Sequence, residues 1–460
     1  MSKQEQINTR LLALEILVEA EKKNIFVKEA LQRFLFQKQF LSKQNRAFIT
    51  RLVEGVTEYR VRLDYVVNLY SKTPISRCKP LIRCLLRMGV YQMLYMDSVP
   101  DGAACDECVK LAKKKGFQNL SGFVNGVLRK VSVNKECLPF PSEEEDLLSF
   151  LSVNYSMPFW IVEKMMEWYG RERTETILKA CLETTDLTVR VNTDKISREE
   201  LTAKLEEKGI CVCQGNYVPE ALHLDKIDYV KRIPGFKQGE FFVQDESSML
   251  LYQIAGLEKM ADSGEVLHIL DLCAAPGGKT TQFAQQLGDR AVVEARDISE
   301  QKTELIEENR KRLGLSNIQV RVWDALEVDE EKKYWADVVI ADLPCSGLGC
   351  ISRKNDIKYH IEEHQLEELV NLQRRILTNG AEYVKPGGLL IYSTCTINPK
   401  ENMENAKWFL KKFPFEAEDI RETIPDELRK SMVGENMLQL LQGEVKCDGF
   451  FVAKFRRISD

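Results

Sequence analysis

Apolar residues recur every three or four positions through the N-terminal third of the chain, which is the spacing of one buried face of an α-helix. The pattern is clearest along residues 48–69 and 81–93. Turn-forming segments separate the apolar stretches at residues 71–74 and 97–102. The pattern therefore predicts an all-helical N-terminal domain, which we place at residues 1–135.

The pattern changes beyond this domain. Pro139, Pro141 and an acidic run make residues 133–146 the best candidate for a linker. Helical and strand-like stretches then alternate, which predicts a small α/β module at residues 146–235. Its expected elements are a helix after Ser156, a strand at 187–191, a helix at 197–208, and strand-like stretches at 210–212 and 221–224.

The last part of the chain, residues 236–460, reads as a Rossmann-like α/β domain. Strands and helices alternate there in the order expected of an open parallel sheet. The expected strands are 266–271, 291–295, 318–322, 336–341 and 388–393, with a last strand at 449–455. Ligands of such sheets bind at the carboxyl ends of the strands, so candidate chemistry is to be sought there.

Composition narrows the class of protein. A chain of 460 residues with 44% hydrophobic residues can bury a large core, which fits two or three domains. Because no apolar run approaches the length of a membrane-spanning helix and the start of the chain carries charges throughout, we expect a cytoplasmic protein without a signal peptide or membrane contact. Thirteen cysteines are then expected to be reduced and mostly buried. The pair Cys105 and Cys108 has no second pair at zinc-ribbon spacing, so we expect no metal site.

Charge is distributed unevenly along the chain. The net charge is −5, but residues 1–130 carry 23 Lys and Arg against 12 Asp and Glu. A basic block is often only a solvated helical surface. Attached to an acidic remainder, it also fits a domain that docks nucleic acid onto an enzyme.

One stretch, residues 268–280, has the form of a ligand cradle. A short aliphatic strand leads into a small, turn-rich loop, and a helix follows. Gly277 and Gly278 allow the backbone to approach a bound molecule closely, and Asp271 supplies a charge at the end of the strand.

Three other interpretations compete for this stretch. A phosphate-binding P-loop requires glycine where Cys273 stands. A dinucleotide fingerprint requires Gly-x-Gly-x-x-Gly, which residues 273–278 do not supply. A plain glycine turn would be the default for two adjacent glycines, but the whole string argues against it.

The string Asp271-Leu-Cys-Ala-Ala-Pro-Gly-Gly-Lys-Thr280 closely resembles the S-adenosylmethionine loop of the RNA 5-methylcytosine methyltransferases. Residues 45–51, 86–91 and 123–129 resemble a NusB-type RNA-binding helical domain, and residues 187–192 and 239–248 resemble the module that shapes the RNA channel in the same family. The resemblance covers the full chain. It implies methylation of carbon 5 of a cytosine in small-subunit (16S) ribosomal RNA, with S-adenosylmethionine as the cofactor.

The resemblance also implies a set of cofactor-binding residues: Asp271, Cys273, Ala274, Ala275, Pro276, Gly277, Gly278, Lys279, Asp297, Asp324 and Asp342. Position alone supports Asp297, because an acid after the second strand is where a ribose diol is gripped in such domains. Asp324 matches the residue on the adenine side in the family, and the competing interpretation is an Asp that begins a turn.

Two cysteines follow neighbouring strand ends, Cys345 in Pro-Cys-Ser-Gly and Cys395 in Ser-Thr-Cys-Thr. Carbon 5 of cytosine is a poor nucleophile, so a thiolate must first add to carbon 6, and a second group must assist release. Spacing does not decide which cysteine attacks. The family resemblance assigns Cys395 as the nucleophile and Cys345 to release, with Asp342 and Lys279 as a polar grip on the base.

A rival hypothesis is a NusB-like RNA-binding or transcription factor with a non-catalytic methyltransferase scaffold. A scaffold has no need to retain Lys279, Asp342, Cys345 and Cys395 together, and all four are present. We therefore expect an enzyme, acting as a monomer on ribosomal RNA. One departure from the family is Asn355, where proline is usual.

Overall fold

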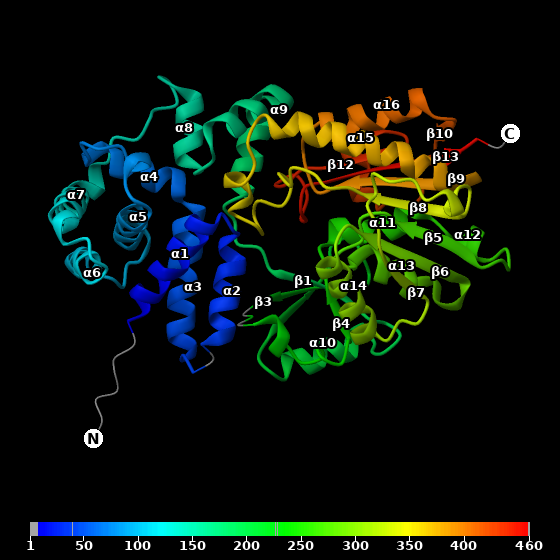
Figure 1. Cartoon of the computed structure of the whole chain (residues 1–460), viewed down its shortest axis with the longest axis horizontal. Coiled ribbons are helices and arrows are strands. Elements are labelled where there is room, and N and C mark those ends of the chain that lie inside the picture. The colour runs from blue at the N-terminus through cyan, green and yellow to red at the C-terminus, as the bar shows by residue number, and fades with distance from the viewer. Residues whose placement is uncertain (1–7, 39, 226, 228, 459–460) are drawn as a thin grey trace. The chain divides into compact units, whose positions relative to one another are not determined.

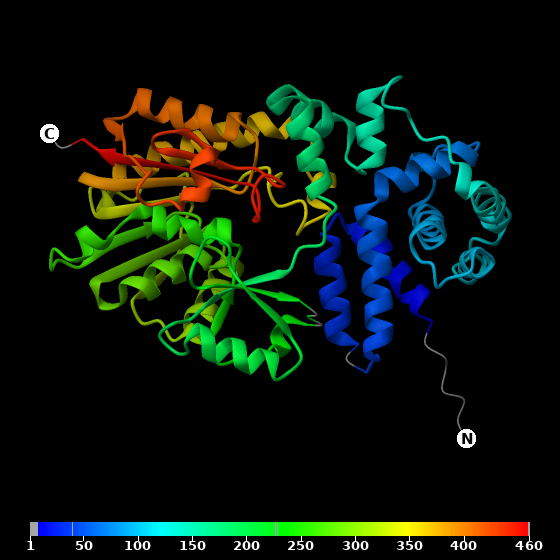
Figure 2. The ribbon, with the colours of Figure 1, turned by 180° about the vertical axis from the view of Figure 1, so that it is seen from behind.

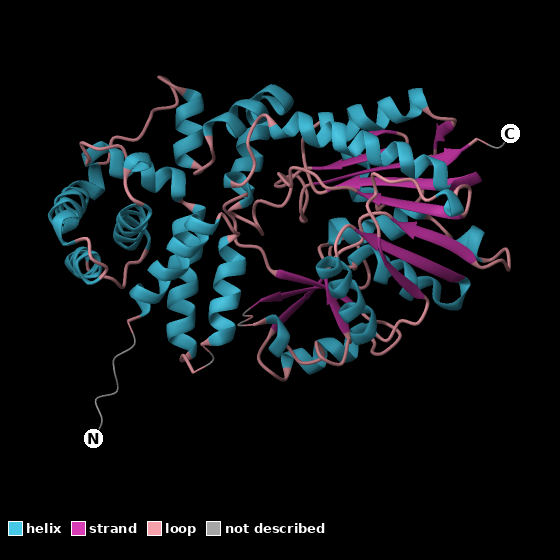
Figure 3. Cartoon of the chain, in the orientation of Figure 1, coloured by secondary structure: helices cyan, strands magenta, loops and turns pink. Residues whose placement is uncertain are grey.

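The computed structural model describes residues 8–38, 40–225, 227 and 229–458. The chain divides into two compact units. The helical unit comprises Met1–Glu183 together with Arg353–Ile361, and the sheet unit comprises Thr184–Ser352 and Glu362–Asp460. Figure 3 shows that, within the described residues, strands occur in the sheet unit alone.

The helical unit packs its first seven helices around one apolar core, which extends from Ala13 to Val131. Its helices are α1 (Thr9–Lys23), α2 (Val27–Gln37), α3 (Lys43–Glu58), α4 (Arg60–Tyr70), α5 (Pro80–Tyr95), α6 (Asp101–Lys114), α7 (Ser121–Asn134), α8 (Leu147–Asn154) and α9 (Phe159–Ala180) (Figure 1). Helix α5 is the central one, with Leu85, Leu86 and Met88 fully buried. The predicted all-helical pattern and the predicted loop at 71–74 are confirmed. The second loop ends earlier than predicted, because α6 begins at Asp101.

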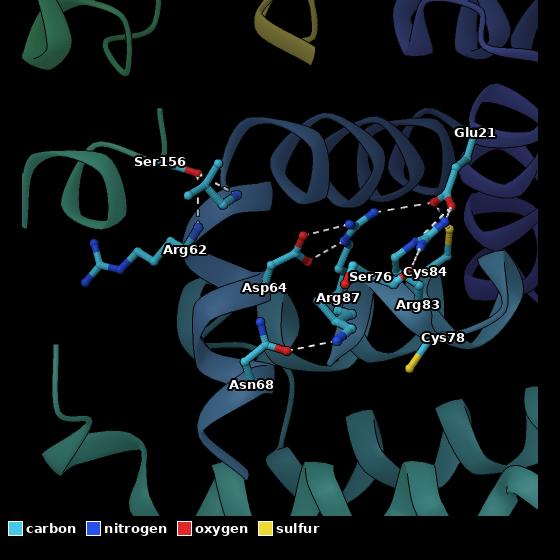
Figure 4. A network of polar contacts seen from close by, with 12 residues as sticks. Glu21, Arg62, Asp64, Asn68, Ser76, Cys78, Arg83, Cys84, Arg87 and Ser156 are labelled. Carbon is cyan, nitrogen blue, oxygen red and sulfur yellow. Dashed lines mark hydrogen bonds and ion pairs between the residues drawn. The ribbon is translucent and has the colours of Figure 1, made fainter. Parts of the chain in front are cut away.

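A polar network crosses this apolar core (Figure 4). The buried guanidinium of Arg87 donates from Nε and Nη2 to both carboxylate oxygens of Asp64, at 2.6 and 2.7 Å, and reaches Glu21 at 3.4 Å. Arg83 also binds Glu21. Because α1, α4 and α5 each supply members, the network fixes their mutual register with charge-assisted hydrogen bonds.

The segment Arg353–Ile361 is part of the helical unit although it lies far along the sequence. Lys358 is buried, and its Nζ donates to the carbonyl oxygens of Ser156 at 2.7 Å and Glu58 at 3.1 Å. Val27 N donates to Asp356 Oδ2 at 2.5 Å. Burial lowers the pKa of Lys358 to about 8. The helices thus hold a segment that directly follows the Cys345–Cys350 loop in the chain.

A small antiparallel sheet opens the sheet unit, in the order β2-β3-β1-β4. Its strands are β1 (Leu187–Val191), β2 (Cys211–Gln214), β3 (Ala221–Asp225) and β4 (Phe241–Val243), with helix α10 (Arg198–Glu206). A capping box between Ser197 and Glu200 begins α10. The predicted strand at 187–191 and helix at 197–208 are confirmed to within two residues.

The large sheet has nine strands in the order β11-β12-β13-β9-β8-β5-β6-β7, with β10 beside β13. The strands are β5 (Leu267–Asp271), β6 (Ala291–Asp297), β7 (Ile318–Val322), β8 (Ala336–Asp342), β9 (Val384–Thr394), β10 (Phe415–Ala417), β11 (Met432–Gly434), β12 (Met437–Leu440) and β13 (Phe450–Arg457). Strands β5 to β9 are parallel, as predicted. The last strand, β13, pairs antiparallel with β9, so the sheet is mixed and not wholly parallel (Figure 2).

Helices cover both faces of this sheet. Ile269 and Ile391 pack on one face in a core with α11 (Glu246–Ala255), α13 (Gly278–Leu287) and α14 (Glu300–Leu313). Their strand neighbours Leu270 and Leu390 pack on the other face with α15 (Gln365–Tyr383) and α16 (Asn405–Lys412). The alternation follows from the two-residue period of a strand, and it makes the strands apolar on both sides. The predicted Rossmann-like fold is thereby confirmed.

Candidate active site

The cradle lies between β5 and α13, as the sequence predicts. Gly277 has a φ of +99°, in the left-handed region that favours glycine, and an added Cβ would lie 3.4 Å from Ile306 Cγ2. The helix begins at Gly278, so its first N–H groups face the loop. These features form a close-fitting backbone cradle for a small ligand.

Asp271, at the end of β5, has unusual surroundings. Its Oδ2 accepts a hydrogen bond from Thr280 Oγ1 at 2.6 Å, whereas the buried Oδ1 has no partner among the described residues. Burial raises the pKa of Asp271 to about 7, against the opposing hydrogen bond from Thr280. A cationic ligand group would satisfy this oxygen, so the residues fit a cofactor that carries an ammonium group.

Asp297 ends β6 and joins it to the cradle. Its Oδ2 accepts a hydrogen bond from Ala275 N at 3.0 Å, and its Oδ1 accepts one from Ile298 N at 2.8 Å and pairs with Lys302 at 3.0 Å. A carboxylate offers about four acceptor positions. Asp297 therefore shapes the loop and still has room for one further donor, such as a ribose hydroxyl.

Asp324 follows β7, and its Oδ1 accepts a hydrogen bond from Leu326 N at 2.9 Å. This contact makes an Asx turn, which is the competing interpretation of the sequence. The turn does not test the cofactor role, which stays a prediction.

Lys279 and Asp342 come together from α13 and β8. Lys279 Nζ lies 2.6 Å from Asp342 Oδ2 and donates to Ser248 Oγ at 2.8 Å. The other oxygen of Asp342 accepts a hydrogen bond from Ser393 Oγ at 2.7 Å. Burial acts to lower the pKa of Lys279, but the charge of Asp342 and the hydrogen bond with it raise that pKa overall. The ammonium group therefore stays charged.

Cys345 and Cys395 meet at the same edge of the sheet. Strands β8 and β9 are parallel, with Asp342 paired to Ser393, so the loops that follow them lie side by side. The two sulfur atoms are 3.4 Å apart, and both side chains are partly exposed. The hydrogen bond with Cys395, together with burial, raises the pKa of the Cys345 thiol well above its ordinary value.

Close backbone packing fixes the Cys345 loop. Gly349 N donates to Cys395 O at 3.1 Å, and Gly449 N donates to Gly349 O at 2.8 Å. A Cβ on Gly349 would lie 2.0 Å from Gly449 O, so no larger residue fits there. A third thiol, that of Cys350, lies 3.8 Å from Cys395 O. No signal in the sequence distinguished Cys350 from a buried core cysteine.

No group of three or more His, Cys, Asp or Glu side chains suited to a metal ion occurs within the described residues. None of the helices described is long and apolar enough to cross a membrane.

Together, the cradle at the first strand, the acids at the next strand ends and the paired thiols define the class of S-adenosylmethionine-dependent methyltransferases. Three family models match the chain: the 16S rRNA methyltransferase RsmB/F at residues 260–456, the NusB family at 7–133, and the ferredoxin-like domain of RsmF/B-like methyltransferases at 157–230. A probable ribosomal RNA small subunit methyltransferase B from Bacillus subtilis is 35% identical over 98% of this chain and 99% of its own. The chain belongs to this family of ribosomal RNA small subunit methyltransferases.

Solved structures agree on the fold. The crystal structure of PH0851 matches 99% of this chain and 100% of its own, with a TM-score of 0.82 at 22% identity. A methyltransferase homologue from Pyrococcus horikoshii matches 68% of this chain and 100% of its own, with a TM-score of 0.56 at 27% identity.

Family membership makes the protein an S-adenosylmethionine-dependent enzyme that methylates ribosomal RNA, which decides against the non-catalytic scaffold. The boundaries 1–135, 146–235 and 236–460 stay predictions. Helices α8 and α9 belong to the helical unit of the structure, whereas the ferredoxin-like family model begins at residue 157.

Proposed function

We propose that the enzyme methylates carbon 5 of a cytosine in small-subunit ribosomal RNA through a covalent bond between Cys395 and carbon 6. The observation that carries this proposal is the 3.4 Å approach of the Cys345 and Cys395 sulfurs beside the Lys279–Asp342 pair. Attack at carbon 6 and release at carbon 5 require two groups at adjacent ring atoms. Two sulfurs in contact meet that requirement.

In this proposal the cradle residues 273–278, with Asp271, Asp297 and Asp324, hold S-adenosylmethionine, which supplies a methyl group on a sulfonium. Asp271 Oδ1 faces no partner among the described residues, so it would take the cofactor ammonium group. The remaining acceptor position of Asp297 would take a ribose hydroxyl.

The chain prepares Cys395 for attack by electrostatics. The positive charge of Lys279 interacts with Cys395, and a nearby cation favours a thiolate. The thiolate adds to carbon 6, and the ring electron pair moves to carbon 5, which takes the methyl group. Asp342 and Lys279 would hold the ring nitrogen and its neighbouring polar groups in place during this step.

Release then falls to Cys345. Its resting pKa is raised chiefly by its hydrogen bond with Cys395. Once Cys395 is a neutral thioether this largest cause disappears, while burial and the carboxylates of Glu401 and Asp342 still act to raise the pKa of Cys345. In this proposal Cys345 then loses its proton to water and acts as a base. It removes the carbon 5 proton, the Cys395–carbon 6 bond breaks, and the aromatic ring is restored.

The target base must leave its stack to reach two thiols at a sheet edge. The basic helical unit is suited to holding the surrounding RNA by its phosphates, and the small sheet to lining the RNA path. The same proposal has the enzyme act as a monomer in the cytoplasm.

Bisulfite sequencing tests the product. Small-subunit ribosomal RNA from a strain that lacks the gene should show one or more cytosines that have lost protection. The intact gene should restore protection, and the Cys395→Ala gene should not. Protection that is the same with and without the gene would refute methylation at carbon 5.

A further inference from the structure

The carboxylate of Glu401 lies between the two cysteine loops. On the Cys345 side, Ser346 N donates to Glu401 Oε2 at 3.0 Å and Ser346 Oγ donates to Oε1 at 2.5 Å. On the Cys395 side, Ser346 Oγ lies 2.7 Å from Thr396 Oγ1, and Asn398 Nδ2 donates to Glu401 Oε1 at 3.0 Å. Glu401 therefore binds the residue that follows Cys345 directly, and reaches the residue that follows Cys395 through one hydroxyl.

Glu401 is fully buried, and its hydrogen-bond partners in the described part of the chain are all uncharged. The fourth bond comes from Gln373 Nε2 at 2.8 Å, and this amide also binds Pro344 O at 2.9 Å. Four donors saturate the four acceptor positions of an ionised carboxylate. Because a carboxylate only accepts, the Ser346 hydroxyl must donate to it, and the Thr396 hydroxyl must donate to Ser346.

The backbone around Glu401 is also specialised. Glu401 lies in a π-helical turn, Lys400–Glu404, and such turns are rare and often occur at functional sites. Asn402 in the same turn donates to Thr396 O at 2.9 Å and accepts from Thr394 Oγ1 at 2.6 Å. The turn thus binds the side-chain hydroxyl of the residue before Cys395 and the backbone carbonyl of the residue after it, while its carboxylate binds the Cys345 loop.

We propose that Glu401 is a positioning residue that sets the separation of the two thiols and so places both of them on the same cytosine. This inference rests on the proposed cysteine mechanism, and it adds a group that does not touch the substrate. The buried carboxylate of Glu401 also disfavours a second thiolate in the resting pair of thiols.

The charge of the side chain is essential to this role. In Glu401→Gln the shape is kept, but one oxygen becomes an NH₂ group that faces the donors of Ser346, Gln373 or Asn398. Opposed donors separate the loops, since a buried donor without an acceptor is costly. Glu401→Asp keeps the charge but is one methylene shorter, so it keeps only some of the four bonds.

The test uses the full-length enzyme and 16S RNA transcribed with 5-fluorocytidine in place of cytidine. Fluorine cannot leave carbon 5 as a proton, so a protein–RNA adduct accumulates and its rate reports attack and transfer without release. S-adenosylmethionine affinity is measured by calorimetry on the same proteins. Glu404→Gln is the matched control, because Glu404 lies in the same π-helical turn but is exposed.

Glu401→Gln should form adduct about 100-fold more slowly at saturating RNA, because misplacing reacting groups by about 1 Å costs that much. Its S-adenosylmethionine affinity should be unchanged, Glu401→Asp should recover part of the rate, and Glu404→Gln should match the wild type. Adduct formation at the wild-type rate in Glu401→Gln would overturn the inference. If Glu401→Gln cannot bind the cofactor, the test rests on Glu401→Asp, provided that this variant retains its affinity for S-adenosylmethionine. Adduct formation at the wild-type rate in Glu401→Asp would then overturn the inference, and a lowered rate would support it. No adduct with the wild-type enzyme would instead refute the cysteine mechanism.

Discussion

Replacing Cys345 by alanine should convert the enzyme into one that stays bound to its product. The sulfur of Cys345 lies 3.4 Å from that of Cys395, so a base held by Cys395 at carbon 6 presents carbon 5 to Cys345. Cys345→Ala leaves the nucleophile and the Lys279–Asp342 pair in place. Attack and transfer should continue, and proton removal should be left to water.

The size of the effect follows from the role. A positioned base contributes about 10²- to 10⁴-fold to a proton transfer, or roughly 3–5 kcal/mol. The adduct should therefore last about 10² to 10⁴ times longer than in the wild type and survive denaturing electrophoresis. With labelled S-adenosylmethionine, the trapped band should carry the methyl label, because transfer precedes release.

Two further variants complete this experiment. Cys395→Ala should give neither adduct nor methylation. Cys137→Ala is a matched control, since this exposed thiol lies in the helical unit, outside the two cysteine loops, and its loss should leave turnover intact. An adduct in Cys395→Ala would reverse the two roles, and normal methylation in both Cys345→Ala and Cys395→Ala would refute the mechanism.

Three other outcomes are expected. Asp297→Ala should weaken S-adenosylmethionine binding by roughly 1.5–3 kcal/mol in calorimetry, because it removes a charge-assisted hydrogen bond to the ribose and leaves Ala275 N without its acceptor. Unchanged affinity would place the ribose contact elsewhere. Affinity for the cofactor should rise about tenfold per pH unit up to the pKa of Asp271 at about 7 and then level off, since only the ionised carboxylate attracts a cation. Asp271→Asn should remove this pH dependence. An equal slope of log affinity against pH in both proteins would exclude Asp271 from the contact. A variant lacking residues 1–139 should bind the cofactor normally but bind RNA with a shallower slope of log affinity against log salt, because the basic helices carry phosphate contacts. If the slope equals that of the full-length enzyme, the helical domain is a scaffold.

The fold was largely predictable because its signals are local. The strand at 318–322 has the predicted bounds, and that at 266–271 begins one residue later than predicted, since short aliphatic runs between turns specify strands with little ambiguity. The direction of β13 was not predictable. An isolated run such as Phe450–Arg457 looks the same whether it pairs parallel or antiparallel with β9.

The site residues likewise divide into those that the local sequence predicts and one that it does not. Lys279, Asp342, Cys345 and Cys395 could be predicted because strand ends and motif strings mark them locally, and the structure brings these four side chains together. Glu401 was missed. Its neighbours Asn-Pro-Lys read as a turn, and its partner Ser346 lies 55 residues away, so only the folded chain shows what the carboxylate binds.

The placement of Arg353–Ile361 in the helical unit has a consequence for recombination. A gene fusion joined near residue 140 would exchange the N-terminal helices but leave Lys358 without its acceptor on Glu58 and Asp356 without Val27. The helical domain is therefore not an interchangeable attachment. A chimaera with another RNA-binding domain would have to carry its own version of residues 353–361. Because that segment begins three residues after Cys350, the exchange would reach the loop that carries Cys345.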